Sequence, residues 1–328
     1  MSAKSESDTR AAKSESDTRA AKSESDTRAT KSESDTRAAK SDNICQSSIL
    51  TFTVTSKVVE RHALLTSAAQ HKTYPFLTLD QPFQIMPTRF HPPNYLKYPQ
   101  ASHQTHILVH AGYDVKPFTS NLFLKTSYIA AVLLPSYMTL CRRIGADMLL
   151  IHGPESYDEY KHLKACLMLL KDVYVDDVKM CVEMPAFAKS LLESYEFTRN
   201  PQQFIKSYLH TIVDAGFEIC VDTAHMFANG MSTDDVIDVL NEFREHYSYI
   251  HLNGNSKPSY SKDKHTTLTP HPDYAPNLIP DVDKLLGHIA GLGVICVSEQ
   301  KCNDLRYFET LAKTYGFTLA NIPVELII

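Results

Sequence analysis

The sequence predicts a single (β/α)8 barrel, a closed ring of eight parallel strands surrounded by helices, preceded by a polar tail. From residue 49 onward, apolar segments of strand length alternate with amphipathic segments of helix length. Eight such repeats in one domain favour a closed barrel over an open sheet. Metal-binding residue types also stand at the ends of most of the expected strands, which is the edge where such barrels carry their active sites.

The N-terminal segment is repetitive. Residues 3–38 contain four copies of a nine-residue unit, Ala-Lys-Ser-Glu-Ser-Asp-Thr-Arg-Ala, with Thr30 in place of the first alanine of the fourth copy. Each unit has two basic and two acidic residues and no side chain able to build a core. We therefore expect residues 1–44 to be a low-complexity, disordered tail and residues 45–328 to form the barrel domain.

The barrel elements are expected in strict alternation. Strands are predicted over residues 49–56, 82–87, 106–111, 147–152, 178–183, 217–222, 247–252 and 294–299. Helices are clearest over residues 127–145, 157–175, 200–216, 233–247, 280–292 and 303–316. Asn200 before Pro201, and Ser232 three residues before Asp235, are typical helix starts. An open doubly wound sheet often has a glycine-rich turn after its first strand, whereas residues 55–58 contain no glycine, so the barrel is preferred.

Composition limits the function classes. A chain of 328 residues, 43% of them hydrophobic, is long enough for one barrel-sized domain and a tail. Neither an apolar run of about 18 residues nor a secretory leader is visible, so we expect no membrane partner. Seven cysteines without a Cys-x-x-Cys pair favour a reducing intracellular compartment, the nucleus or the cytoplasm, including a viral replication site. The net charge of −5 gives no support to a nucleic-acid partner, although bound metal reverses charge locally.

The most informative residues are the histidines and acids at the strand ends. Six of the eight expected strands end on one of them: His110, His152, Glu183, Asp222, His251 and Glu299. Three further residues of these types follow in the loops, namely His225, Asp263 and His265. Any one of them alone is more commonly a helix cap or an ordinary polar group. Because the strand ends of a barrel meet at one mouth, all nine together predict a multinuclear metal centre.

The residues around these positions resemble the endonuclease IV family, the class II apurinic/apyrimidinic endonucleases. The matching stretches occur in the family's order over residues 82–300. They are Val-His110-Ala-Gly-Tyr, Ile-His152-Gly-Pro, Val-Glu183-Met, Asp222-Thr-Ala-His225-Met-Phe-Ala-Asn-Gly, Ile-His251-Leu-Asn, Asp263-Lys-His265 and Ser-Glu299. The stretch that begins at Asp222 is the most specific of these motifs.

The resemblance implies three zinc ions per chain. The implied ligands are His110, His152 and Glu183 for the first ion, Glu183, Asp222, His251 and Glu299 for the second, and His225, Asp263 and His265 for the third. The implied reaction is hydrolysis of the phosphodiester 5′ to an abasic site in double-stranded DNA, which leaves a 3′ hydroxyl. Glu183 would bridge two ions, and Glu299 would orient or deprotonate the attacking water. We expect the protein to be a monomer.

The resemblance indicates the DNA-contacting residues less directly than the metal ligands. Members of the family flip the abasic nucleotide and fill the gap with wedge side chains near the barrel mouth. Tyr113, three residues past His110, matches a wedge position, although it could equally pack on its own loop. Arg89, after the second strand, is a second candidate for a DNA contact.

The chain departs from the family pattern in its loops. The first strand lacks the family's small and histidine residues and the glycines after them. Met184-Pro185-Ala186 stands where the family has an asparagine and a glycine-rich loop, and Gly254-Asn255 stands where it usually has Asn-Asp. Residues 266–273 contain no glycine, whereas the family has a glycine-containing segment there. Glycine lets a backbone approach phosphate closely, so these changes affect the loops that contact DNA and leave the metal ligands in place. Such departures are typical of a divergent member, for instance a viral one.

Two other functions fit part of the pattern. A sugar isomerase or epimerase of the xylose-isomerase type uses one or two divalent ions on the same scaffold. That function gives no reason for a further group of ligands at His225, Asp263 and His265. A non-catalytic DNA-binding relative is the other alternative, and the complete ligand set speaks against it. The number of bound ions and the cleavage of an abasic duplex separate the three functions.

Overall fold

The structure is a computed structural model. It describes residues 47–55, 83–87, 93, 105–112, 115, 117–118, 132–173, 177–261, 263–300, 302 and 304–320. The tail predicted at residues 1–44 lies outside the described residues, as do Arg89 and Tyr113. Expectations for these parts of the chain stay predictions.

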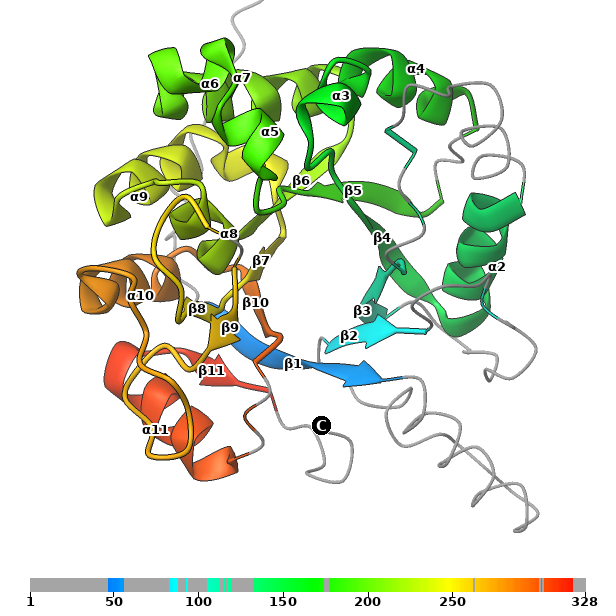
Figure 1. Ribbon diagram of the computed structural model, residues 1–328. Coiled ribbons are helices and arrows are strands. Elements are labelled where there is room, and N and C mark those ends of the chain that lie inside the picture. Colours follow the sequence, from blue (N-terminus) through cyan, green and yellow to red (C-terminus); the bar gives the residue numbers. More distant parts are fainter. Residues whose placement is uncertain are drawn as a thin grey trace, which may run out of the picture. The chain divides into compact units, whose positions relative to one another are not determined.

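Eight parallel strands form a closed barrel (Figure 1). They are β1 (Ile49–Thr55), β2 (Phe83–Met86), β3 (Thr105–His110), β4 (Ala146–His152), β5 (Lys179–Glu183), β6 (Glu218–Asp222), β7 (Tyr249–His251) and β10 (Ile295–Ser298). Each strand pairs with the next in this order, and β1 pairs with β10, with Leu50 opposite Cys296, which closes the ring. A short strand, β11 (Thr318–Leu319), also pairs with β1. The predicted fold class is confirmed, and all eight predicted strands lie within about two residues of their expected bounds.

Helices surround the barrel (Figure 1). They are α2 (Leu134–Ile144), α3 (Tyr157–Tyr160), α4 (Leu163–Val173), α5 (Lys189–Leu192), α6 (Tyr195–Arg199), α7 (Pro201–Asp214), α8 (Thr223–Ala228), α9 (Thr233–Glu242), the 3-10 helix η5 (Arg244–His246), α10 (Val282–Ala290) and α11 (Leu305–Tyr315). The helix predicted over residues 157–175 is two helices, α3 and α4. In the described part of the chain, no helix combines the length and the apolar character needed to cross a membrane.

Two predicted helix starts are confirmed by their hydrogen bonds. The Asn200 side chain accepts a hydrogen bond from the backbone N–H of Gln203 at the start of α7. At the start of α9, the Ser232 hydroxyl accepts from the Asp235 N–H, and the Asp235 carboxylate accepts from the Ser232 N–H. Both arrangements satisfy backbone donors that the first turn of a helix leaves unpaired.

The interior of the barrel is filled by alternate strand residues. Successive side chains of a strand point to opposite faces, so every second residue faces inward. The residues that pack together inside are Leu108, Met148, Leu150, Cys181, Cys220, Tyr249 and Val297. The residues between them on the same strands pack in the larger core formed with the helices. Cys181 and Cys220 are therefore ordinary buried thiols of the barrel core.

Candidate metal centre

The six strand-end residues of the predicted site share the inward register of the barrel core. His110 lies two residues after Leu108, and Glu183 lies two residues after Cys181. The same spacing relates the other four to the interior residues of their strands, namely His152, Asp222, His251 and Glu299. Because every second residue of a strand faces inward, these side chains point to the axis of the barrel. They form the layer next to the apolar residues that fill its interior.

Glu183 lies at the centre of the cluster. Its Oε2 is 3.4 Å from His110 Nε2 and 3.5 Å from His152 Nε2. Its Oε1 is 3.1 Å from His251 Nδ1 and 3.4 Å from His225 Nδ1. One carboxylate therefore contacts four imidazole rings that come from three different strands and from helix α8.

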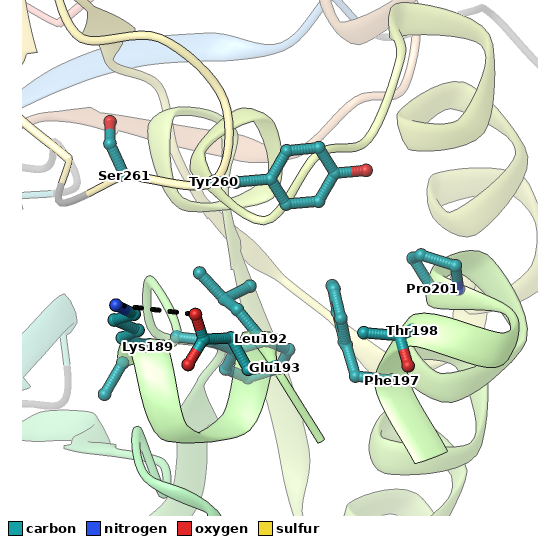
Figure 2. A pocket seen from close by; sticks show the side chains of 10 residues that line it. Lys189, Leu192, Glu193, Phe197, Thr198, Pro201, Tyr260 and Ser261 are labelled. Carbon is teal, nitrogen blue, oxygen red and sulfur yellow. Dashed lines mark ion pairs between the residues drawn. The ribbon is translucent and has the colours of Figure 1, made fainter. Parts of the chain in front are cut away.

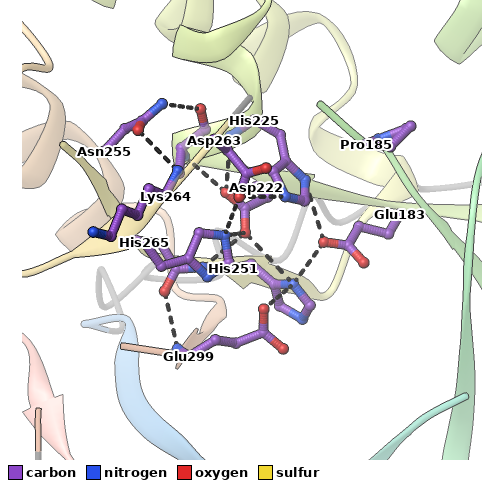
Figure 3. Close-up of polar contacts among 12 residues, drawn as sticks. Glu183, Pro185, Asp222, His225, His251, Asn255, Asp263, Lys264, His265 and Glu299 are labelled. Atoms are coloured by element: carbon purple, nitrogen blue, oxygen red, sulfur yellow. Dashed lines mark hydrogen bonds and ion pairs between the residues drawn. The ribbon is translucent and has the colours of Figure 1, made fainter. Parts of the chain in front are cut away.

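The remaining acids extend the cluster on both sides (Figure 3). Glu299 Oε2 is 3.4 Å from His251 Nδ1. Asp263 Oδ2 is 3.2 Å from His265 Nε2 and 3.6 Å from His225 Nε2. Asp222 also contacts His251 and His265, so all nine residues predicted from the sequence are joined in one network of contacts.

Two groups within the network place their ligand atoms within 4.8 Å of one another. The first group is His110, Glu183, His251 and Glu299, and the second is Asp222, His225 and His265. Asp222 was expected beside His251, and its Oδ2 is in fact 3.8 Å from His251 Nδ1 and 3.7 Å from His265 Nε2. Asp222 therefore lies between the two groups.

Backbone carbonyls orient two of the histidine rings. His110 Nδ1 lies 2.8 Å from the carbonyl oxygen of Ala111, and His225 Nδ1 lies 2.9 Å from that of Met184. A carbonyl only accepts hydrogen bonds, so in each neutral ring Nδ1 carries the proton. The lone pair of Nε2 is then left facing the carboxylates of the cluster, as a metal ligand requires.

Gln84, on β2, is a residue of the site that sequence reasoning missed. Its side chain is fully buried and lies between two of the predicted ligands. Its amide nitrogen donates to Glu299 Oε1 at 2.7 Å, and its amide oxygen is 2.8 Å from His251 Nε2. Because the carboxylate only accepts, the amide oxygen must face the ring, and Nε2 of His251 donates to it. Nδ1 of His251 then faces Glu183 Oε1 at 3.1 Å. The signal in the sequence was a polar residue within an apolar strand.

Asn253 and the first turn of α8 hold Asp222. Asp222 Oδ1 accepts hydrogen bonds from the backbone N–H groups of Ala224 and His225, as the N-cap of the helix. Its Oδ2 accepts from the Asn253 side chain at 2.7 Å. The Asn253 oxygen in turn accepts from the Glu299 N–H at 2.9 Å. Asn253 lies in the Ile-His251-Leu-Asn stretch, but nothing in the sequence pattern indicates its role.

The electrostatics of the cluster fit divalent ions. Burial alone would raise the pKa of Glu183, but the charge of His251 and the imidazole of His110 beside it hold that pKa well below its ordinary value. Burial alone would lower the pKa of His225, but Asp222 and Asp263 raise it well above its usual value. The buried atoms Glu183 Oε2 and His265 Nε2 have no hydrogen-bond partner among the described residues. Such atoms cost on the order of 1–3 kcal/mol each, which a cation bound at each of them would offset. His and carboxylate donors together suit zinc and similar ions.

The comparisons with known proteins show the fold. No protein-family model matches the sequence, and no curated protein matches it. Endonuclease IV from Thermus thermophilus is similar in structure, with a TM-score of 0.51 and 16% identity over 81% of this chain and 99% of that chain. A xylose isomerase domain protein from Alicyclobacillus acidocaldarius has a TM-score of 0.46 and 13% identity over 84% and 91%. An L-ribulose 3-epimerase has a TM-score of 0.45 and 11% identity over 84% and 89%. The likeness to endonuclease IV shows that this chain has the same barrel architecture.

The position of Gln84 predicts a loss of metal affinity when its amide is removed. Gln84→Met keeps the length of the side chain but frees both the His251 ring and the Glu299 carboxylate. We expect the dissociation constant for zinc to rise about 10- to 100-fold, because residues that orient metal ligands have effects of this size. Competition with a chromogenic chelator measures this dissociation constant. Gln300→Met is the matched control, since Gln300 is also buried and donates to the Leu252 carbonyl. Equal zinc affinity in the two variants would contradict the role of Gln84.

Proposed function

We propose that the protein is a zinc-dependent endonuclease that hydrolyses the phosphodiester 5′ to an abasic site in double-stranded DNA. The observation that carries the proposal is the group formed by His225, Asp263 and His265, which joins the Glu183-centred group through Asp222. Nine ligand-type side chains are enough for three ions, and an enzyme with one or two ions has no use for the last group. The shared architecture with an endonuclease IV structure supports the same proposal.

The charge of the site suits a phosphodiester only when ions are bound. Four carboxylates meet at the mouth, namely those of Glu183, Asp222, Asp263 and Glu299. Without cations they would repel a phosphate group. Bound zinc would supply the positive charge that attracts the phosphate, make water more acidic and stabilise charge on the leaving oxygen. The residues of this chain would therefore act mainly by holding the ions and the proton acceptor in fixed positions.

Two glutamates have separate tasks in this proposal. Glu183 is almost fully buried, and its two oxygens face different histidines, so it would bridge two ions. Glu299 is more exposed, and Gln84 holds one of its oxygens, so its carboxylate would accept the proton of the attacking water. Gln84 and His251 fix the direction of that carboxylate before substrate arrives.

The alternative function is a sugar isomerase or epimerase with one or two divalent ions. It would use only the group centred on Glu183 and would leave His225, Asp263 and His265 without a task. The metal content of the purified protein separates the two functions. We expect three zinc ions per chain for the endonuclease, against one or two manganese or magnesium ions for the isomerase.

Cleavage of a duplex with one abasic site tests the proposal. We expect zinc-dependent cleavage 5′ to the abasic sugar, a 3′ hydroxyl product, and loss of activity with a chelator. Glu299→Gln should keep most of the zinc and lower turnover about 100-fold or more, because an amide cannot accept the proton of the water. Gel analysis of product ends and metal analysis measure both. Turnover close to that of the unchanged protein, with full zinc, would remove Glu299 from the mechanism.

His225→Ala tests the separate third ion. We expect one zinc ion fewer per chain and a loss of turnover far larger than any loss of DNA affinity, because an ion at the leaving oxygen acts mainly in the transition state. His210→Ala is the control, since His210 is exposed and pairs with Glu242 away from the cluster. An effect on DNA affinity alone, with zinc content and turnover intact, would make His225 a packing or DNA-contact residue.

A further inference from the structure

A hollow of the molecule is formed by segments that follow strands β5 and β7. A cavity of 650 Å³ lies between helices α5 and α6 and the loop that carries Tyr260 and Ser261 (Figure 2). Its walls are largely apolar and aromatic, with Phe187, Leu192, Phe197 and Tyr260 among the lining residues. None of its lining residues belongs to the nine ligand-type residues of the cluster.

The cavity is tied to the cluster through helix α8. Phe187 follows Glu183 by four residues, and its N–H donates to the Asn229 side chain just after α8. Tyr260 precedes Asp263 by three residues, and its N–H donates to the carbonyl of Ala228 at 2.6 Å. Both walls are therefore anchored on the helix that presents His225. A ligand in the cavity would lie on the same side of the barrel as a phosphate at the ions.

The loop that carries Tyr260 is closed at its base. Strands β8 (Gly254–Asn255) and β9 (His265–Thr266) pair in antiparallel fashion. The Asn255 side-chain oxygen accepts hydrogen bonds from the backbone N–H groups of Lys257 and Lys264, one at each end of the loop. The loop thus holds a defined position next to the ligands Asp263 and His265.

Tyr260 is held by its neighbours and is nevertheless open to solvent. Its φ of 59° is in the left-handed region, which an ordinary residue adopts only when its surroundings demand it. Its ring lies against Gly230, where a Cβ atom would collide with it, and it meets Phe197 edge-on with ring centroids 6.5 Å apart. Even so, 57% of Tyr260 is exposed. A flat aromatic face that is fixed before binding and left accessible suits a planar ligand.

The charges at the rim suit a ligand that carries phosphate. Lys189 pairs with Glu193, at 3.5 Å, and both side chains are mostly exposed. An exposed ion pair of this kind contributes little to stability. The Lys189 amine can therefore leave Glu193 and pair with a phosphate at a small cost in free energy. Lys257 and Lys264 do not line the cavity, but both are exposed on the loop that carries Tyr260.

From these features we propose that the cavity binds a nucleobase of the DNA strand next to the abasic site, stacked on Tyr260. The proposal rests on the proposed function and extends it with a second contact to the substrate. Aromatic stacking accepts any of the four bases, so the cavity would add affinity without reading the sequence. Lys189 at the rim, with Lys257 and Lys264 on the neighbouring loop, would meet the flanking phosphates.

The probe is a duplex with 2-aminopurine beside one abasic site, bound to zinc-loaded protein in which Glu299→Gln slows cleavage. The chain has no tryptophan, so 2-aminopurine emission is read with little protein background. We expect quenching on binding. Tyr260→Ala should abolish the quenching and weaken binding about tenfold, whereas Tyr260→Phe should keep both. Leu192→Glu, on the opposite wall, should have the effect of Tyr260→Ala without altering the loop. Tyr195→Ala, at an exposed tyrosine outside the lining, is the matched control.

The outcomes separate the cavity from the catalytic function. Equal affinity and quenching in Tyr260→Ala and Tyr195→Ala, with abasic cleavage intact in the unchanged protein, would overturn the cavity proposal and leave the endonuclease. A single-stranded oligonucleotide with one 2-aminopurine gives the reverse test. Tyr260-dependent quenching of that probe, without any cleavage of abasic duplex, would keep the cavity as a nucleobase site and overturn the endonuclease. No binding of either probe would overturn both.

Discussion

The buried carboxylate of Glu183 is the constraint on which the site depends. It is removed from water at the centre of the barrel mouth, and such a charge is very costly unless opposite charges or hydrogen-bond donors surround it. Four histidine rings surround it, and the other acids of the cluster lie against those rings. Removing one partner would leave the rest uncompensated, so the cluster acts as a unit.

The barrel supplies both the ligands and the groups that aim them. The register that turns His110 inward also places the carbonyl of Ala111 against the far nitrogen of its ring. Gln84, from the neighbouring strand β2, holds His251 and Glu299 at once. His110, His225, His251, Glu299 and Asp222 each have a hydrogen-bond partner on the scaffold, which orients them before any ion binds.

Helix α8 connects the metal cluster with the cavity beside it. Its N-cap is Asp222, its first turn carries His225, and its last residues accept or flank the hydrogen bonds that hold Phe187 and Tyr260. A barrel of this architecture hosts isomerases as readily as nucleases, so the fold does not decide the function. Support for a function therefore comes from the candidate ligands His225, Asp263 and His265 and from the aromatic cavity.

The sequence by itself determined the barrel and the inward direction of its polar strand ends. Both depend on local periodicity. The alternation of residues along a strand decides which side chains face inward, and the regular succession of strands and helices predicts the closed ring. Only the tertiary structure decided which groups support the ligands. Gln84 meets Glu299 and His251 across 215 and 167 positions of the chain, and no local pattern encodes contacts so distant. The same holds for Tyr260, whose exposed ring owes its position to Gly230 and Ala228 on another loop and helix. The periodicity of the sequence indicates which way a side chain points. Its contact partners depend on how the barrel closes and how the loops pack on it.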